Sequence, residues 1–290
     1  MKIITIIVTY NGMKWIDSCL RSLRMSTVPC TKVIIDNMST DGTLDFIRAN
    51  YPEVIILPQT QNLGFGQANN VGMRYALEQK ADYVLLLNQD AYIADNMIQL
   101  LIAQSDGKSL LSPVHLNGDG SALDANFKQN TLLRATNTLL DDLLIDSLSA
   151  KYPVHYVNAA CWFMPISILH HIGGFNPLFR QYSEDDNYVH RLHYHHIPLY
   201  VVPQAKVRHD RKMVGNITVY KKGKVKRELF SEACNIDHTF PQRLKQYLKV
   251  INDQRDKPLE CLQALLWLPT QTLKTAKSRK VEKQPVPHWL

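Results

Sequence analysis

Short apolar runs alternate with stretches of helical periodicity through the first half of the chain. The β-branched run "KIITIIVTY" at 2–10 is nearly continuous, which is typical of a strand buried on both faces. Three further strands are predicted, at 32–36, 53–58 and 83–88, with helices before or between them, at 13–25, 43–50 and 66–80. This repetition predicts βαβ units in an α/β protein with a doubly wound, mainly parallel sheet.

The pattern loosens after Ala91 and returns later in the chain. Residues 117–138 read as a loop-rich, mobile segment. A strand and a short helix that ends at Gly173-Gly174 are predicted within 156–175, followed by a helix at 182–195 and a strand at 198–210. Residues 211–290 read as mostly helical. We therefore expect a domain over 1–210 and a helical, basic extension over 211–290.

Polar residues stand at three predicted strand ends: Thr9-Tyr10-Asn11, Asp36-Asn37 and Asn88-Gln89-Asp90. Ligands of open parallel sheets bind at the carboxyl ends of strands, so these groups are expected on one rim. Asp36 suits hydrogen bonds from a ribose or a base. Asp90 suits a hard divalent cation such as Mg²⁺ or Mn²⁺, which takes carboxylate and phosphate oxygens. Plain loop and turn roles remain open for both.

The segment "QNLGFGQANNVGM" contains Gly64, Gly66 and Gly72, with Asn62 and Asn70 as polar markers. It matches neither a dinucleotide-binding fingerprint nor a P-loop. Its glycines allow close backbone approach to a ligand, whereas a simple strand-to-helix turn explains them equally well.

An acidic cluster, "SEDDN", places Glu184 and Asp185 next to Asp186 at a predicted helix start. It is either a solvated helix start or a general base poised against a hydroxyl. Arg191 is expected near this acidic turn. His209 ends the last predicted strand, where a metal, a phosphate or a structural partner could engage it.

Six motifs in order resemble the inverting glycosyltransferases of family 2, in particular their rhamnosyltransferase-like branch. They are "VTYNG", "IDNMSTDGT", "QNLGFGQANNVGM", "LLLNQD", "IGGFNPLF" and "SEDDNYVHRL", spread over residues 3–210. The resemblance implies a GT-A fold, with a nucleotide-sugar-binding half at 1–95 and an acceptor-binding half at 96–210. It also implies transfer of a sugar from dTDP-rhamnose or a UDP-sugar to a hydroxyl of a glycan or polyprenyl-linked acceptor, in the synthesis of cell-surface polysaccharide.

The resemblance also assigns roles to residues. The base and ribose pocket would hold Thr9 and Tyr10, with Asp36 contacting the nucleoside. The remaining donor-side residues implied are Asn11, Asn37, Asn62, Asn70 and Asn88. The divalent cation would bind Asp90, with His209 beside the metal or the diphosphate. Asp185 would be the catalytic base, with Glu184 next to it and the choice between the two left open.

Three departures from the family pattern are visible. Asn88 replaces the first acid of the family's D-x-D motif, Gln89 stands where proline is frequent, and Asn187 replaces the last acid after Glu-Asp. A single carboxylate at this motif raises the question of whether Asp90 suffices to hold the metal.

The formal charge of +7 favours an anionic partner and comes largely from the end of the chain. There, "LECLQALLWLPTQTLKTAKSRK" joins an apolar run to basic residues, which predicts either docking on an anionic membrane or a helix packed on the catalytic domain. The basic residues gather in this tail and not on an aromatic groove, so no nucleic-acid partner is expected. The alternatives to transfer are a nucleotide-binding module and a sugar nucleotidyltransferase-type enzyme.

The cysteines and the apolar runs indicate the cellular compartment of the protein. The five cysteines are widely spaced and form no C-x-x-C pair, which is typical of reduced thiols in a cytoplasmic protein. No apolar run reaches the length of a bilayer span. We expect a cytoplasmic protein, at the inner face of the membrane where its tail docks.

Overall fold

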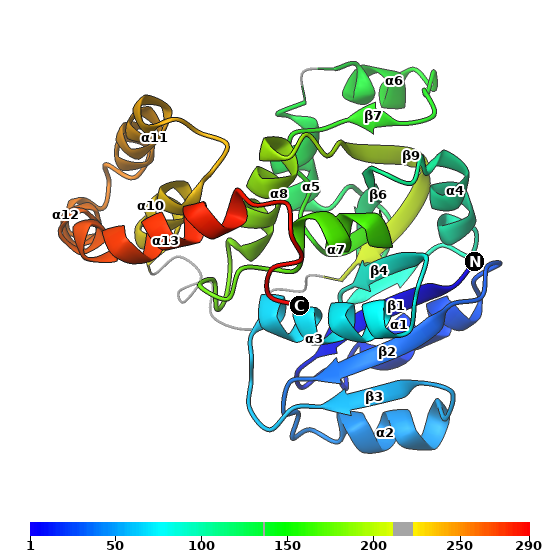
Figure 1. Cartoon of the computed structure of the whole chain (residues 1–290). Helices are drawn as coiled ribbons and strands as arrows, with labels where there is room; N and C mark the ends of the chain where they lie inside the picture. Colours follow the sequence, from blue (N-terminus) through cyan, green and yellow to red (C-terminus); the bar gives the residue numbers. More distant parts are fainter. Residues whose placement is uncertain (136, 211–222) are drawn as a thin grey trace.

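The computed structural model describes residues 1–135, 137–210 and 223–290. Its strands form one nine-stranded sheet in the order β3-β2-β1-β4-β8-β6-β9-β5, with β7 added beside β9 (Figure 1). The strands are β1 Ile3–Thr9, β2 Thr31–Asp36, β3 Ile55–Pro58, β4 Tyr83–Leu87, β5 Ala91–Ile93, β6 Leu110–Asn117, β7 Tyr152–Pro153, β8 Cys161–Pro165 and β9 Leu199–His209.

The sheet is mixed, which corrects the expectation of a mainly parallel one. Strands β3, β2, β1 and β4 are parallel to one another, as are β6 and β9. Strand β8 lies between β4 and β6 and runs antiparallel to both, and β5 and β7 run antiparallel to β9. The reversed β8 brings the residues that precede it to the rim where β1, β2 and β4 end.

The helices of the sheet domain are α1 Ile16–Arg24, α2 Thr43–Asn50, α3 Phe65–Glu78, α4 Met97–Gln104, α5 Ala125–Phe127, α6 Leu139–Leu144, α7 Ile166–Ile172 and α8 Glu184–Tyr194. The predicted helices are present, and three helices that were not predicted, α4 to α6, lie between residues 97 and 144. Helix α7 stops at Gly173, whose φ of +73° suits glycine. The loop expectation for 117–138 is partly wrong, because α5 and a π-helical turn at Lys128–Leu132 lie there, with Phe127 fully buried.

Helices cover both faces of the sheet, and each face has its own core. Alternation along β1 sends Ile6 to the core shared with α3, α7 and α8, and Ile7 to the core shared with α1, α2 and α4. This double burial explains the continuous apolar runs of the central strands, because neither face meets water.

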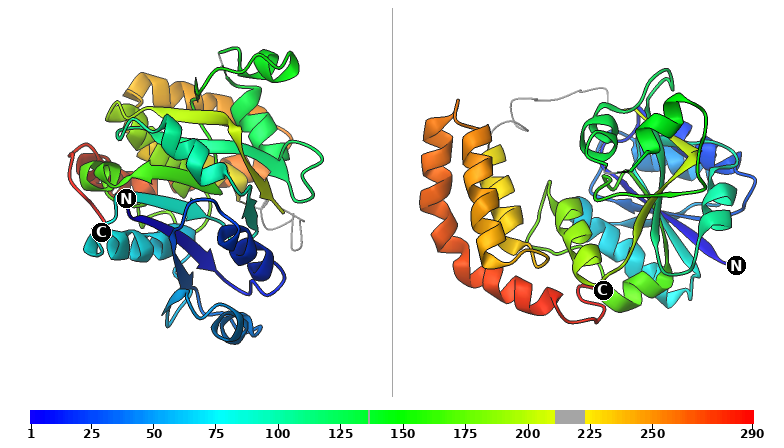
Figure 2. Two further views of the ribbon diagram at one scale, coloured as in Figure 1. Left: turned by 90° about the vertical axis from the view of Figure 1, so that its right-hand side faces the viewer. Right: turned by 90° about the horizontal axis from the view of Figure 1, so that it is seen from above.

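The C-terminal helices stand to one side of the sheet domain (Figure 2). They are α10 Lys224–Cys234, α11 Phe240–Asp253, α12 Pro258–Trp267 and α13 Thr272–Glu282, with a 3₁₀ turn at Leu268–Gln271 between the last two. Val225, Leu229, Cys261 and Ala264 form a small core of their own. None of the described helices combines the length and the apolar character that crossing a bilayer requires.

The end of the chain returns to the sheet domain and packs on Arg191. The guanidinium donates from Nη1 to the Gly174 carbonyl at 2.5 Å and lies 4.6 Å from the Trp289 ring. Arg191 is fully buried, and burial lowers the pKa of its guanidinium. The contacts of Arg191 are therefore with the loop after α7 and with the C-terminal segment, and a position near the acidic turn stays a prediction.

Candidate functional site

The predicted rim exists, because parallel strands bring their carboxyl ends together. Thr9 at the end of β1 is in register with Asp36 at the end of β2, and β4 runs parallel on the other side of β1. The polar groups that follow these three strands therefore share one edge of the sheet.

Gln89, which the sequence presented only as a departure from the family pattern, connects two of these strand ends. Its Oε1 accepts hydrogen bonds from Thr9 Oγ1 at 2.6 Å and from the Tyr10 backbone N at 3.1 Å. Its Nε2 donates to the Tyr10 carbonyl at 3.3 Å. Thr9 is thus buried and engaged by Gln89, whereas the Tyr10 ring remains 47% exposed at the rim.

Asp36 lies at the rim almost fully buried. The backbone N of Ser39 donates to both of its carboxylate oxygens, at 3.3 and 3.2 Å. Both distances are at the long end of the range for hydrogen bonds, so the carboxylate is loosely held by its own loop.

Three predicted asparagines shape the loops of the rim. Asn11 has a φ of +49° and accepts from the Thr40 backbone N at 2.8 Å. Asn37 accepts from the Leu63 N at 2.9 Å and donates to the Gly64 carbonyl at 3.2 Å. Asn62 accepts from the Gly64 N at 2.9 Å. These side chains hold the loops that surround the rim.

Asn70 lies away from the rim, on the buried face of α3. Its Nδ2 donates to the Phe175 carbonyl at 2.8 Å, and its Oδ1 accepts from the Phe175 N at 2.7 Å. Both amide atoms are therefore used to join α3 to the loop after α7. A position beside the donor stays a prediction for this residue.

Asp90 and His209 meet because of strand pairing. Strand β5 pairs with β9 so that Ala91 faces His209, which places the preceding Asp90 next to the imidazole. His209 Nε2 lies 3.3 Å from Asp90 Oδ1 and 3.4 Å from Asn88 Nδ2. On the other side of the ring, Nδ1 lies 4.0 Å from a carboxylate oxygen of Asp124.

The possible ligand atoms around His209 meet part of what a divalent cation requires. The Asn88 Oδ1 atom is buried without a hydrogen-bond partner among the described residues, beside a carboxylate and an imidazole nitrogen. Asp124 behind Nδ1 matches the carboxylate that commonly orients a metal-binding histidine. No cluster of three or more His, Cys, Asp or Glu side chains able to hold a metal occurs in the described ranges, so substrate oxygens would have to complete the shell.

Asp185 and Glu184 at the acidic helix start lie in different environments. Asp185 is half-buried, and its Oδ2 accepts a 2.8 Å hydrogen bond from the Tyr156 hydroxyl. Glu184 is 7% exposed and packs against Gly66 of α3, and its Oε2 has no partner among the described residues. Tyr156, like Asp124, was not singled out from the sequence, because nothing local marks either residue.

Burial and mutual repulsion act on the neighbours of Asp185. Burial, helped by the charge of Asp185, raises the pKa of Glu184 to about 8. Burial and the same charge raise the pKa of Asp186 to about 7. Close carboxylates disfavour one another's ionisation, so the cluster holds protons at neutral pH that isolated carboxylates would lose.

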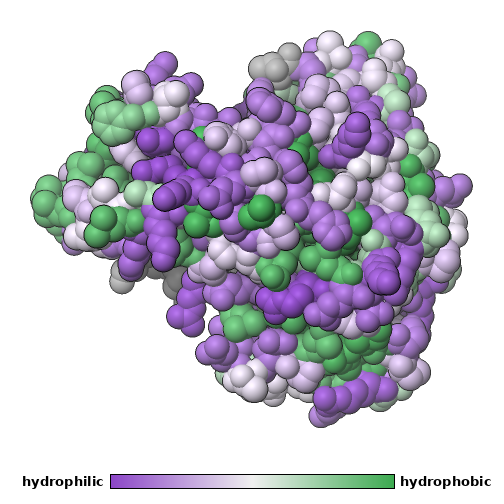
Figure 3. All heavy atoms as spheres, in the orientation of Figure 1, coloured by the Kyte–Doolittle hydropathy of each residue, from purple (hydrophilic) through white to green (hydrophobic). Residues whose placement is uncertain are grey.

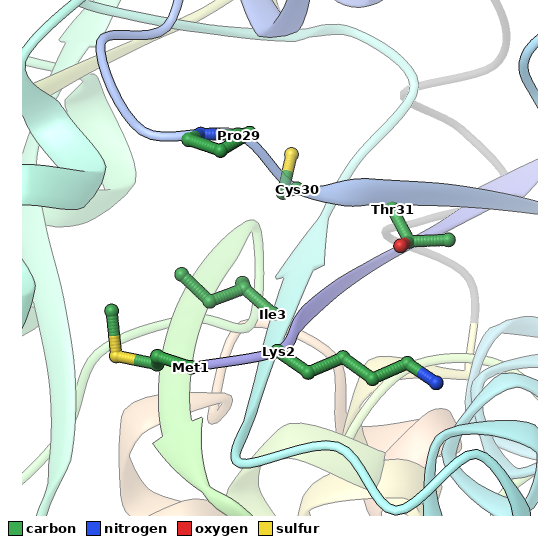
Figure 4. Close-up of a pocket in the computed structure, with 6 residues that line it drawn as sticks. All are labelled: Met1, Lys2, Ile3, Pro29, Cys30 and Thr31. Atoms are coloured by element: carbon green, nitrogen blue, oxygen red, sulfur yellow. The ribbon is translucent and has the colours of Figure 1, made fainter.

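A separate hollow of about 300 Å³ opens at the amino ends of β1 and β2, lined by Met1–Ile3 and Pro29–Thr31 (Figure 4). The Lys2 side chain points out of it, and its Nζ donates to the Gln79 carbonyl at 2.7 Å. It lies at the end of the strands opposite to the rim and brings no cluster of polar groups together.

Residues 4–142 match the model of glycosyl transferase family 2. The N-acetylglucosaminyl-diphospho-decaprenol L-rhamnosyltransferase of Mycobacterium tuberculosis is 26% identical over 231 residues, which cover 70% of this chain and 74% of the relative. The dTDP-rhamnosyl transferase RfbF of Shigella flexneri is 30% identical over 135 residues, 45% of each chain. Together these matches support a family 2 glycosyltransferase of the rhamnosyltransferase-like kind.

The fold agrees with solved structures of glycosyltransferases. The mannosyltransferase PcManGT from Pyrobaculum calidifontis, solved with GDP-Man and Mn²⁺, superposes with a TM-score of 0.60 at 16% identity, covering 97% of this chain and 86% of that one. The expected GT-A fold is confirmed. The family match sets aside both alternatives, the nucleotide-binding module and the nucleotidyltransferase-type enzyme, and confirms the rhamnosyltransferase-like character.

Proposed function

We propose that the enzyme transfers a sugar from dTDP-rhamnose or a UDP-sugar to a hydroxyl of a glycan or polyprenyl-linked acceptor, in the synthesis of cell-surface polysaccharide. The observation that carries this proposal is the Asp90–His209 pair beside the unpartnered Asn88 Oδ1, at the rim where parallel strands end. A carboxylate, an imidazole nitrogen and an amide oxygen in one place suit a divalent cation that is bound to a nucleoside diphosphate. The names of the two relatives above support the rhamnosyl and lipid-linked classes.

The donor would lie over the rim between β1, β2 and β4. Exposed Tyr10 and the loosely held Asp36 are the proposed contacts for the base and ribose. The ordered loops around Asn11, Asn37 and Asn62 supply the walls, and Thr9 acts through the Gln89 hydrogen bond. This assigns the nucleotide-sugar half to residues 1–95 and the acceptor half to 96–210, with 211–290 as the extension.

A divalent cation, Mg²⁺ or Mn²⁺, would be held by Asp90 and His209 together with the Asn88 carbonyl oxygen. When bound, it supplies positive charge where the leaving nucleoside diphosphate gains negative charge. Asp124 would keep the His209 ring in orientation.

Asp185 is the proposed general base, and the surroundings favour it over Glu184. The Tyr156 hydrogen bond fixes its carboxylate, and its half-buried position leaves it open to an acceptor hydroxyl. Glu184 is enclosed against α3 and carries a raised pKa of about 8. Asp185 would take the proton of the acceptor hydroxyl as that oxygen attacks the anomeric carbon from the face opposite the leaving group, which inverts the configuration.

Membrane contact through the C-terminal helices is part of the proposal. Phe240, Leu244 and Leu248 repeat every four residues on one face of α11 and are 68, 48 and 66% exposed. Leucines of α12 and α13 extend this apolar surface, which appears as green spheres over α11 and α12 in Figure 3. The exposed lysines on α11 and α13 are Lys245, Lys249, Lys274, Lys277 and Lys280.

Apolar side chains flanked by lysines suit an anionic lipid surface. We therefore place the enzyme in the cytoplasm at the inner face of the membrane. Its five free cysteines fit a reducing compartment.

A donor screen tests the transfer activity. The full-length enzyme is incubated with dTDP-rhamnose and with several UDP- and GDP-sugars, each with Mn²⁺ and a polyprenyl-diphosphate-linked sugar, and release of nucleoside diphosphate is measured. With dTDP-rhamnose or with one of the UDP-sugars, we expect release of nucleoside diphosphate that depends on the acceptor. Absence of acceptor-dependent release with every donor would contradict the proposed activity.

A further inference from the structure

A cavity of about 360 Å³ lies between the loop that leads into α8 and the C-terminal helices. Ser183, the residue before Glu184, forms part of its wall, so the cavity borders the helix start that carries Asp185. Its volume is in the range of small-ligand sites. The cavity is lined by Leu178, Phe179, Arg180, Gln181, Tyr182, Ser183, Arg227, Phe230, Trp267, Gln271 and Lys274.

One wall of the cavity is aromatic. The Phe230 ring lies 5.5 Å from that of Phe179 and 5.7 Å from that of Trp267, so α10 connects the sheet domain to α12 through ring contacts. Tyr182 is 41% exposed and lies under the Arg227 guanidinium at 5.2 Å. Rings in this arrangement provide a rigid surface for an apolar or sugar group.

The other feature is positive charge contributed by three separate segments. Arg180 comes from the loop before α8, Arg227 from α10 and Lys274 from α13, and no Asp or Glu occurs among the described lining residues. Planar guanidinium groups match phosphate oxygens in pairs, and lysine adds a point charge. Three cationic side chains in the lining of one cavity favour a ligand with more than one negative charge.

The cavity also adjoins the donor side of the enzyme. A Cβ at Gly64 would lie 2.0 Å from the Arg180 carbonyl oxygen, so the loop after Asn62 touches the backbone of the cavity wall. Exposed Leu178 lines the cavity, and Leu273, which is 86% exposed, precedes Lys274. A ligand held by the cations would therefore have the catalytic helix on one side and apolar surface on the other.

We propose that this cavity binds the diphosphate of an acceptor that carries this group between its sugar and an apolar tail. Arg180, Arg227 and Lys274 would hold the diphosphate, and the aromatic wall would support the adjoining groups, so that the sugar hydroxyl reaches Asp185. The inference rests on the proposed function and specifies its acceptor class. The same diphosphate chemistry is present in the sugar donor, so the test must separate the two sources.

Binding of farnesyl diphosphate to the full chain provides that test. Affinity is measured by calorimetry with EDTA and with saturating dTDP or UDP present, so that metal binding and donor-site binding are both suppressed. We expect the Arg227→Gln/Lys274→Gln variant to bind about 100-fold more weakly, since each lost charged contact is worth about tenfold. Arg74→Gln/Lys108→Gln, which removes one arginine and one lysine exposed elsewhere, should bind like the wild type.

Three results would overturn the proposal. They are equal affinity in the Arg227→Gln/Lys274→Gln variant, equal binding of farnesol, which carries no phosphate, and displacement of farnesyl diphosphate by the nucleoside diphosphate. Either of the first two results would mean that farnesyl diphosphate binds through its apolar tail. The third would mean that the cavity binds the sugar donor and not the acceptor. Lys274→Gln alone, at an exposed position, should still weaken binding about tenfold if the double variant does not fold.

The assay separates this inference from the proposed function, because it measures no turnover. An enzyme that binds farnesyl diphosphate through the cavity but releases nucleotide from no donor contradicts only the proposed activity. An active enzyme whose affinity for farnesyl diphosphate is unchanged by substitution of Arg227 and Lys274 contradicts only the cavity assignment.

Discussion

The Tyr156 hydroxyl donates a 2.8 Å hydrogen bond to the Asp185 carboxylate and so connects the segment before β8 with the first turn of α8. The two residues are far apart in the sequence and meet because β8 is reversed in the sheet. This contact gives the acidic helix start one carboxylate of defined orientation, while its neighbour Glu184 is enclosed by α3.

Asp185→Asn tests the base directly. We expect turnover to fall roughly 10²- to 10⁴-fold, because general-base assistance is lost, while the affinity for the donor stays unchanged. Nucleotide release gives the rate, and calorimetry with the nucleoside diphosphate gives the affinity. Turnover close to that of the wild type would assign the base elsewhere in the cluster.

Tyr156→Phe should act through Asp185. Removing the hydroxyl leaves the ring in place but frees the carboxylate to rotate, so we expect kcat to fall about tenfold with little change in the donor KM. A loss that appears only as a lower unfolding temperature, with kcat unchanged, would mean that Tyr156 serves packing alone.

Glu184 should make the fold less stable as the pH rises. Its pKa is raised to about 8 in the folded protein, from a usual value of 4.5, so the folded protein keeps a proton that the unfolded chain loses. The contribution of Glu184 to the free energy of unfolding is therefore highest below about pH 4.5 and falls until pH 8.

Glu184→Gln should remove this decline and add about 3 kcal/mol at pH 8 relative to pH 5. Urea unfolding at both pH values measures it, with the exposed Glu78→Gln as control. An unchanged pH profile in Glu184→Gln would show that Glu184 does not carry the effect.

Removal of divalent cations should abolish transfer, and Mn²⁺ or Mg²⁺ should restore it. Asp90→Asn should raise the metal concentration for half-maximal activity by roughly tenfold or more, because a ligand charge is lost. The exposed Asp119→Asn should leave that concentration unchanged. Full activity in EDTA would exclude a cation at Asp90 and His209.

The apolar face of α11 should determine membrane binding. In flotation with vesicles rich in anionic lipid, Leu244→Gln/Leu248→Gln should shift most of the protein to the unbound fraction. Leu144→Gln/Ile145→Gln removes even more exposed apolar side chains at the end of α6 and should still float. Equal recovery of all three proteins with the vesicles would show that another surface of the protein binds the membrane.

The sequence predicted the elements of the first half well because their apolar spacing is unambiguous. Helix α2 has the predicted bounds, β1 and β2 end at predicted polar residues, and β4 ends directly before them. It could not predict the direction of β8, because a strand buried on both faces has the same apolar run whichever way it points. The rim could be predicted because each group of its polar residues stands at the end of a strand in the sequence.

Contacts that depend on the reversed strand could not be predicted in the same way. Tyr156 reaches Asp185 only through β8, and Asp124 reaches His209 only because β6 pairs with β9. Gln89 appeared as a substitution for proline, and its hydrogen bonds to Thr9 and Tyr10 require the three-dimensional loop. The contact of Arg191 with Trp289 could not be predicted, because Trp289 comes from the end of the chain.

The position of β8 has a consequence for how the protein forms during synthesis. Strand β4 hydrogen-bonds to β1 on one side and to β8 on the other, and Leu87 pairs with Cys161. Until residues 161–165 have left the ribosome, the apolar strand "YVLLL" is an open edge able to pair with other nascent chains. The stretch at 4–142 that matches the family model therefore cannot complete its own sheet, and a fragment cut at that boundary is expected to aggregate.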